Sequence, residues 1–196
     1  SDLPIEMPKG NMVVDIGGGT TEVAIISLSA TAYSESLRVA GSELDESIIR
    51  YLQKKYQVAI GYIAAEKIKI EAASVLPMED KGDPISIVGK DMFTGIPRNI
   101  KIPRDEIREA IEEPVSAIID SVKRALEKLP PEFVSDLHEA GMVLTGGGAM
   151  LKGLNKRIET ETDIRVRVVD DPLFSVVLGS GRAIEDMGRY KKVFIN

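Results

Sequence analysis

The chain has 196 residues, enough for one domain or two small lobes, and 43% hydrophobic with 29% charged residues is a globular rather than a disordered composition. It carries 25 Lys and Arg against 31 Asp and Glu, a net charge of −6, and the basic residues are scattered, which argues against nucleic acid as the main partner. Cysteine is absent and His138 is the single histidine, so disulfides and thiolate metal sites are excluded and a Ser-His-Asp triad is hard to build.

The first third of the chain predicts three strands and a helix. Two β-branched runs, residues 12–16 and 23–28, flank a glycine-rich turn and predict a hairpin, which the extended stretch 31–39 extends. Apolar residues then recur at helical spacing, which predicts a helix over residues 43–56 with Ser42 as its N-cap.

The middle of the chain changes character. A second helix is expected over residues 62–76, followed by a small hairpin lobe within residues 78–103, where glycine and proline punctuate short strands. Helical periodicity returns at Asp105; Pro114 should kink or split this helix, and Pro130 should end the helical segment.

The last third reads as strand, helix, strand and helix. The strands are expected at residues 142–145 and 164–169, with a helix over 149–160 between them and a closing helix after 172. This order predicts an α/β layer with parallel pairing. We therefore expect a larger α/β subdomain of about five strands from residues 1–40 and 104–196, divided by a smaller inserted subdomain, residues 41–103.

The first glycine loop, Gly17 to Thr20, follows a strand that ends near Asp15. Glycine lets backbone N–H groups approach an anion closely. A strand follows this loop instead of a helix, and the chain has no Gly-Lys-Ser/Thr, so a P-loop is excluded. The hairpin tip could bind phosphate, with Asp15 holding Mg²⁺ directly or through water. The alternatives are a plain tight turn and an aspartate that caps it.

The second glycine loop begins at Gly146, between a strand and a predicted helix. Gly146-x-Gly148 and the later Asp170 partly imitate a dinucleotide fingerprint, but Leu151 stands where its third glycine would be. This match alone is weak evidence for a dinucleotide site.

The two loops together are more specific than either one. Val13 to Ala24 resembles the second phosphate loop of the actin-like ATPase superfamily, and Val143 to Leu154 resembles its adenosine loop. Residues 171–181 are similar to the connecting helix that follows. Further stretches resemble the MreB family of bacterial actin homologues, namely residues 36–48, 65–71 and 116–127.

The resemblance implies a ribonuclease H-like α/β sheet with helices on its faces, a small inserted α+β lobe, and an ATP or ADP site with Mg²⁺. The first loop would contact the phosphates, the second loop the adenosine, and Asp15 the metal through water. The expected nucleotide-binding residues are Gly17, Gly18, Gly19, Thr20, Glu66, Lys67, Ile68, Lys69, Gly146, Gly147, Gly148 and Ala149. Thr21 and Glu22 could orient the attacking water. A solvated surface is the alternative for the charged helix at 66–69.

The function that the resemblance implies is that of a filament-forming ATPase that determines cell shape. Its partners would be copies of itself, head to tail, and the cell-wall elongation machinery at the inner membrane. The alternatives are another actin-superfamily ATPase, of chaperone or sugar-kinase type, and a structural module that binds no nucleotide. No apolar run approaches the roughly 20 residues that span a bilayer, so a soluble, intracellular protein is expected. The resemblance implies a cytoplasmic location, with membrane association of the intact protein.

One element of the superfamily pattern has no match in residues 1–196, namely the hairpin that carries the first phosphate loop. The chain thus resembles the second half of such a protein. We expect these residues alone to bind ATP weakly, to hydrolyse it poorly, and to be monomeric in dilute solution.

Overall fold

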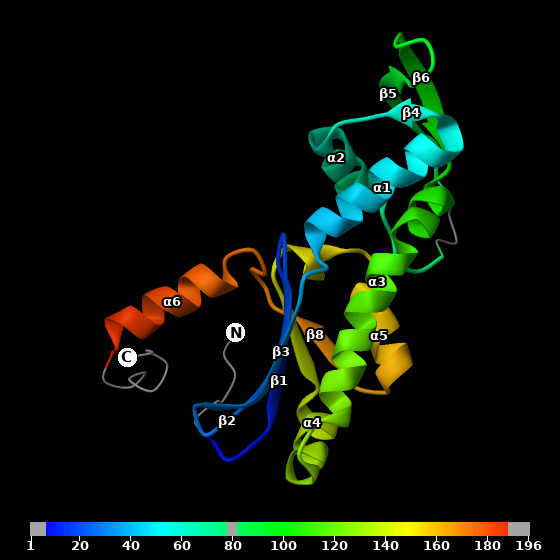
Figure 1. Cartoon of the computed structure of the whole chain (residues 1–196). Coiled ribbons are helices and arrows are strands. Elements are labelled where there is room, and N and C mark those ends of the chain that lie inside the picture. Colours follow the sequence, from blue (N-terminus) through cyan, green and yellow to red (C-terminus); the bar gives the residue numbers. More distant parts are fainter. Residues whose placement is uncertain (1–6, 78–81, 188–196) are drawn as a thin grey trace.

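The computed structural model describes residues 7–77 and 82–187 (Figure 1). The remaining residues of the two predicted subdomains, 1–6, 78–81 and 188–196, lie outside the described part. Within the described part, no helix combines the length and the apolar character needed to cross a membrane.

A five-stranded mixed sheet has the order β3-β2-β1-β7-β8. Its first three strands form an antiparallel meander, and β7 and β8 pair in parallel with β1 and with each other, as the strand and helix order predicts. These strands are β1 (Asn11–Ile16), β2 (Thr21–Ser27), β3 (Ala30–Leu37), β7 (Met142–Thr145) and β8 (Val166–Val168).

A separate antiparallel sheet contains three strands in the order β4-β5-β6. The hairpin of β5 and β6 confirms the strands expected between residues 82 and 103. None of the described residues between 41 and 103 adds a strand to the larger sheet. The strands are β4 (Val58–Ala59), β5 (Ile85–Asp91) and β6 (Pro97–Ile102).

The described residues also form six α-helices and two short 3₁₀ helices. They are α1 (Gly41–Tyr56), α2 (Tyr62–Ala72), α3 (Arg104–Glu127), η1 (Pro131–Phe133), α4 (Val134–Ala140), η2 (Gly147–Met150), α5 (Leu154–Thr162) and α6 (Ser175–Glu185). Figure 1 shows α1, α2 and the small sheet at one end of the molecule, while α3 runs along the larger sheet.

The sequence predicts that Pro114 kinks or splits its helix. The split is wrong, because α3 is continuous from Arg104 to Glu127, and the kink stays a prediction. Pro114 is buried, and the neighbouring Ile111, Val115 and Ile118 are buried in the core. Proline removes one helical hydrogen bond, but packing on both sides of it holds the helix together.

Three predicted helix ends also differ from the structure. Helix α1 begins at Gly41, so Ser42 lies in its first turn and makes no side-chain cap. Helix α2 ends at Ala72, four residues early, because Ser74 forms a parallel bridge with Lys152. Helix α5 begins at Leu154 instead of near 149, because η2 occupies the preceding residues.

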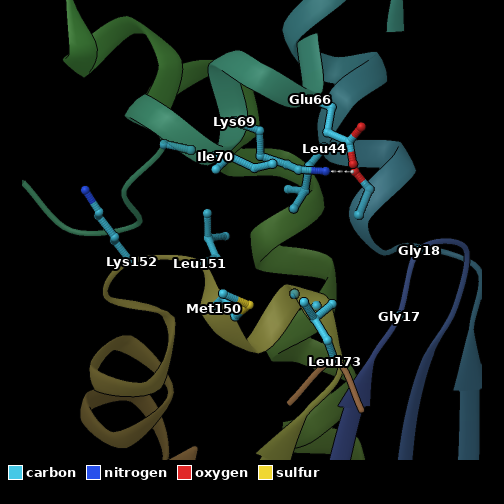
Figure 2. Close-up of a pocket in the computed structure, with 14 residues that line it drawn as sticks. Gly17, Gly18, Leu44, Glu66, Lys69, Ile70, Met150, Leu151, Lys152 and Leu173 are labelled. Atoms are coloured by element: carbon cyan, nitrogen blue, oxygen red, sulfur yellow. Dashed lines mark hydrogen bonds between the residues drawn. The ribbon is translucent and has the colours of Figure 1, made fainter. Parts of the chain in front are cut away.

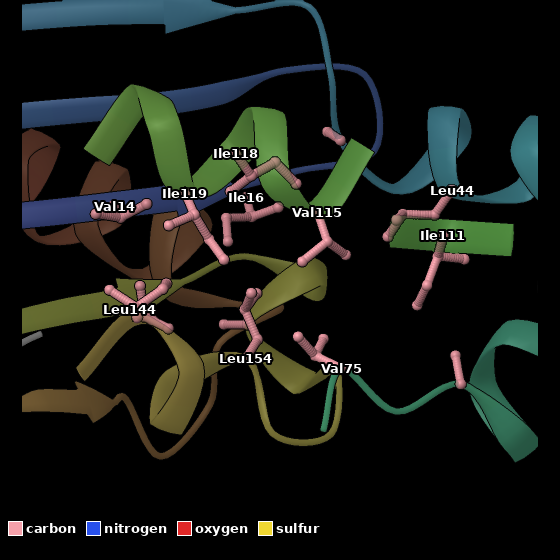
Figure 3. Close-up of a cluster of buried hydrophobic side chains, with 14 of the residues drawn as sticks. Val14, Ile16, Leu44, Val75, Ile111, Val115, Ile118, Ile119, Leu144 and Leu154 are labelled. Carbon is pink, nitrogen blue, oxygen red and sulfur yellow. The ribbon is translucent and has the colours of Figure 1, made fainter. Parts of the chain in front are cut away.

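The core lies between the larger sheet and α3 (Figure 3). Alternate residues of β1, including Val14 and Ile16, point to this side and meet Ile118 and Ile119 of α3. Helix α5 adds Leu154 to the same cluster. Each such side chain stabilises the fold by about 1.5–3 kcal/mol when buried, so these contacts fix the sheet whose strand ends carry both glycine loops.

Candidate functional site

A cavity of about 480 Å³ lies between the two glycine loops, the start of α1 and one side of α2 (Figure 2). This volume is in the range of small-molecule sites. Its lining residues are Gly17, Gly18, Gly41, Leu44, Glu66, Lys69, Ile70, Ala73, Gly147, Gly148, Met150, Leu151, Lys152 and Leu173. Loops far apart in the sequence, near residues 18 and 148, therefore meet at one site.

The first glycine loop is fixed through its carbonyl groups. The Gly17 N–H donates to the Thr20 carbonyl at 2.9 Å and closes the turn. The start of α1 then donates to the loop: Gly41 N–H to the Gly17 carbonyl at 3.1 Å, and Ser42 N–H to the Gly18 carbonyl at 2.7 Å. The N–H groups of Gly18 and Gly19 donate to no acceptor in the described residues, which leaves them available to an anion.

Two glycines of the second loop are required by close packing on the end of β1. Gly146 has φ +80°, and a Cβ there would overlap the Asp15 carboxylate and the Ile16 carbonyl. A Cβ on Gly148 would overlap the Ile16 side chain. By contrast, a Cβ on Gly18 or Gly19 would meet no protein atom within 4 Å, so protein packing does not require these two glycines.

Helix α2 faces the cavity with Glu66, Lys69 and Ile70. Lys69 Nζ donates to the Gly41 carbonyl at 3.0 Å, the dashed line in Figure 2, and to Asp45 Oδ2 at 2.9 Å. Residues 66, 69, 70 and 73 share this side of the helix because three- and four-residue spacings superpose on a helix. Glu66 and Lys69 thus belong to the cavity wall.

Six of the predicted nucleotide-binding residues line the cavity and six do not. Lys67 is exposed, with its Nζ 3.8 Å from Glu71 Oε1, and Ile68 is buried in the core. These two α2 side chains therefore point away from the cavity. The other four belong to the glycine loops without lining the cavity, namely Gly19, Thr20, Gly146 and Ala149.

The catalytic role predicted for Thr21 does not fit its position. Its side chain is fully buried, and its hydroxyl donates to the Val39 carbonyl at 2.7 Å. This bond connects the first residue of β2 to the segment that follows β3. Glu22 is exposed and stands opposite Asp15 in the β1–β2 register. The role of Glu22 stays a prediction.

Asp15 lies at the end of β1, in register with Glu22 on one side and Thr145 on the other. Burial raises the pKa of the Asp15 carboxyl, and the Glu22 carboxylate raises it further. Residues 7–77 and 82–187 contain no group of three or more acidic or histidine side chains that could hold a metal ion. Asp15 could therefore contribute to a metal site only together with a ligand or water.

Sequence reasoning did not identify part of the cavity wall as site residues. Ile70 could have been found from its four-residue spacing to Glu66 on one helix face. Leu173 carried no local sequence signal that marks it as a site residue. Its place at the cavity depends on a tertiary contact, because the Gly146 N–H donates to the carbonyl of the preceding Pro172 at 3.0 Å. The other missed residues are Gly41, Leu44, Ala73, Met150, Leu151 and Lys152.

Solved structures define the class of the fold. MreB 5 of Spiroplasma citri bound to AMPPNP has a TM-score of 0.90 and 32% identity, with 97% of this chain and 57% of that chain covered. The MamK double helical filament has a TM-score of 0.67 and 24% identity, with 84% of this chain and 50% of that chain covered, and shows likeness of fold. The fold is that of the actin-like ATPases.

The particular family follows from the sequence comparisons. The family model for MreB/Mbl protein matches residues 1–192, and the chain belongs to this family. Cell shape-determining protein MreB of Escherichia coli strain K12 is 46% identical over 183 residues, and Mbl of Bacillus subtilis strain 168 is 40% identical over 190 residues. These alignments cover 93% and 97% of this chain but only 52% and 57% of the relatives, about half their length.

Proposed function

We propose that the cavity binds ATP and ADP. The observation that carries this proposal is the pair of glycine loops that meet across the cavity. The Gly18 and Gly19 N–H groups donate to no acceptor among residues 7–77 and 82–187. The Spiroplasma citri relatives were solved with AMPPNP and with ADP, which supports the same ligand class here. Phosphates would lie at the first loop and the adenosine along the second loop and α2.

The residues present fit a nucleotide with Mg²⁺. Open space at Gly18 and Gly19 provides room for phosphate oxygens. Asp15 is the predicted protein group near the metal, and because Mg²⁺ retains several waters, one carboxylate acting through water is a sufficient protein contribution. Bound Mg²⁺ would neutralise phosphate charge. Asp15 would orient its water, and Glu22 is the remaining candidate for positioning the attacking water.

We further propose that the intact protein forms head-to-tail filaments that determine cell shape. The names of the bacterial relatives support the cell-shape role, and the matches to MreB and Mbl disfavour the chaperone and sugar-kinase alternatives. An association with the inner membrane and with the cell-wall elongation machinery belongs to the same proposal. So do the division into a larger and a smaller subdomain and the correspondence of this chain to the second half of its relatives.

A titration of the 196-residue chain with a fluorescent ADP analogue, with and without Mg²⁺, tests nucleotide binding. Saturable binding that unlabelled ATP and ADP reverse is the expected result. Absence of saturation at millimolar nucleotide would contradict the proposal and favour a structural module that binds no nucleotide.

Light scattering over a concentration series tests self-association. Head-to-tail contacts add subunits without forming a closed ring or pair. The average molar mass should therefore rise gradually with protein concentration, starting from that of a monomer. A two-fold dimer that is stable at micromolar protein would contradict the proposal, because a pair that closes on itself cannot extend through the same surface.

A further inference from the structure

Lys69 is held between two acceptors on α1. Its Nζ donates to Asp45 Oδ2 at 2.9 Å and to the Gly41 carbonyl at 3.0 Å. The Lys69 side chain is 16% exposed and that of Asp45 is 11% exposed. Withdrawing two charges from water is costly, so such a pair is weak evidence for stability and better evidence for a fixed arrangement.

The backbone of Gly41 connects this ion pair to the first glycine loop. The Gly41 carbonyl accepts from Lys69, while the Gly41 N–H donates to the Gly17 carbonyl at 3.1 Å. The following N–H, that of Ser42, donates to the Gly18 carbonyl at 2.7 Å. A continuous set of hydrogen bonds thus runs from α2, through the first turn of α1, to the loop.

Asp45 lies one helical turn beyond Gly41 and does not line the cavity. Its second oxygen, Oδ1, is buried and has no hydrogen-bond partner among the described residues. Without Lys69, both oxygens of this carboxylate would be unpaired and largely shielded from water, which is a strongly unfavourable state. Asp45 and Lys69 therefore hold each other in place.

We propose that Asp45 is a positioning residue of the nucleotide site: it holds Lys69 on the Gly41 carbonyl and so fixes the first turn of α1, from which the first glycine loop is suspended. This inference rests on the proposed nucleotide function. It assigns Asp45 no contact with the ligand, and it predicts that the loss of Asp45 affects phosphate binding at the far end of the bonded set.

The change Asp45→Asn separates this role from simple electrostatics, because the two predict opposite signs. Removing a negative charge near the site should strengthen binding of an anionic nucleotide through space. Weakening the hold on Lys69 should instead loosen the loop. If the loss of this one charge-assisted hydrogen bond is expressed fully at the loop, ADP affinity falls by up to roughly tenfold, whereas the affinity for adenosine, which has no phosphates, should change by less than about threefold.

The matched control is Glu46→Gln, the same charge change at the next position of α1. Glu46 contacts Arg50 and accepts from the Tyr62 hydroxyl, and it is not part of the bonded set. Because only the through-space charge effect acts at this position, Glu46→Gln should not lower the ratio of ADP to adenosine affinity. Tighter or unchanged ADP binding in Asp45→Asn, or equal losses for ADP and adenosine, would overturn the proposal.

Hydrogen exchange of the chain without nucleotide gives a second readout. The Ser42 N–H and the neighbouring loop amides should exchange faster in Asp45→Asn than in the unsubstituted chain, with the rest of α1 unchanged. Unaltered exchange there would overturn the positioning role even if nucleotide binds normally, whereas failure of the unsubstituted chain to bind ADP would contradict only the proposed function. If Asp45→Asn does not fold, the double variant Asp45→Asn/Lys69→Met, which leaves no unpaired charge, is compared in the same exchange experiment.

Discussion

The backbone N–H of Ser42 donates to the carbonyl of Gly18 at 2.7 Å. The first N–H groups of a helix have no partner within the helix, and here the loop carbonyls satisfy two of them. The same bonds turn the loop carbonyls toward α1, and the Gly18 and Gly19 N–H groups donate to no acceptor in the part of the chain that the structure describes. One contact thus serves both the fold and the candidate site.

The change Gly146→Ala should destabilise the protein. A Cβ at this position overlaps the Asp15 carboxylate and the Ile16 carbonyl, and alanine is strained at φ +80°. Overpacking of this kind should lower the free energy of unfolding by about 1–3 kcal/mol. Unfolding in urea measures this change. The control Gly19→Ala, whose Cβ meets no protein atom within 4 Å, should unfold like the unsubstituted chain. Equal stability of the two variants would show that the second loop does not pack on β1 as described.

The change Gly18→Ala should weaken nucleotide binding without altering stability. Its Cβ has free space in the protein but stands at the cavity wall, where the phosphates are proposed to lie. The added methyl group should displace a phosphate from the backbone N–H. Loss of one good hydrogen bond to a charged phosphate corresponds to an ADP affinity that is about tenfold or more lower. Displacement of a fluorescent ADP analogue measures it.

The control for that change is Gly61→Ala. Its Cβ also meets no atom within 4 Å, and Gly61 does not line the nucleotide cavity. Its ADP affinity should equal that of the unsubstituted chain. If Gly18→Ala binds ADP equally well, the phosphates do not lie at the first loop.

The change Thr21→Val tests the structural role assigned to Thr21. It removes the hydroxyl that donates to the Val39 carbonyl at 2.7 Å and leaves that carbonyl without this donor. The free energy of unfolding should fall by about 1–3 kcal/mol, since a buried group loses its partner. ADP affinity, measured well below the unfolding midpoint, should stay the same. A variant that is fully stable but binds ADP poorly would restore Thr21 to the site.

Much of the fold could be predicted because it follows local patterns. The β-branched runs on each side of Gly17 fixed the first hairpin, and the strand and helix order near Gly146 fixed the parallel pairing. The glycine loops were recognisable because close backbone approach requires glycine, as the contact of Gly148 with Ile16 shows. Such signals act within a few residues of the chain.

Features set by long-range packing could not be predicted in this way. Ser42 has the side chain of an N-cap, but the Gly18 carbonyl takes its N–H, so the helix starts earlier. Pro114 is tolerated because its neighbours are buried on the sheet. Leu173 reaches the cavity only through tertiary contacts, for which one sequence carries no local signal.

Ion pairs between α3 and α5 should make the stability of the protein depend on pH. Arg157 donates to both oxygens of Glu112, at 2.8 and 2.6 Å, and to Glu161 at 2.9 Å. Hydrogen bonds from Arg157 lower the pKa of Glu112 below its ordinary value of 4.5. Lys123 and then Arg157 lower the pKa of Glu161 in the same way.

A carboxyl with a lowered pKa in the folded state binds its proton less tightly there than in the unfolded chain. Its contribution to stability is therefore present above pH 4.5, the ordinary value, and is lost as the pH falls through the folded pKa. Arg157→Met keeps the apolar stem but removes the charge. Near neutral pH the variant should be less stable by about 0.5–1 kcal/mol, a small effect because Glu112 is about half exposed and solvent screens the pair.

The difference between Arg157→Met and the unsubstituted chain should shrink as the pH falls below 4.5, since Glu112 and Glu161 lose their charge as the pH passes through their lowered pKa values. Urea unfolding at a series of pH values measures it, and effects of the other titrating groups cancel in the difference. The control is Lys156→Met, which changes the adjacent exposed lysine on α5. Lys156 makes no ion pair with the described residues, so the stability of this variant should run parallel to that of the unsubstituted chain at every pH. A difference for Arg157→Met that stays constant down to pH 3 would mean that Arg157 stabilises the contact between α3 and α5 by packing alone, and that its pairing with Glu112 contributes nothing measurable.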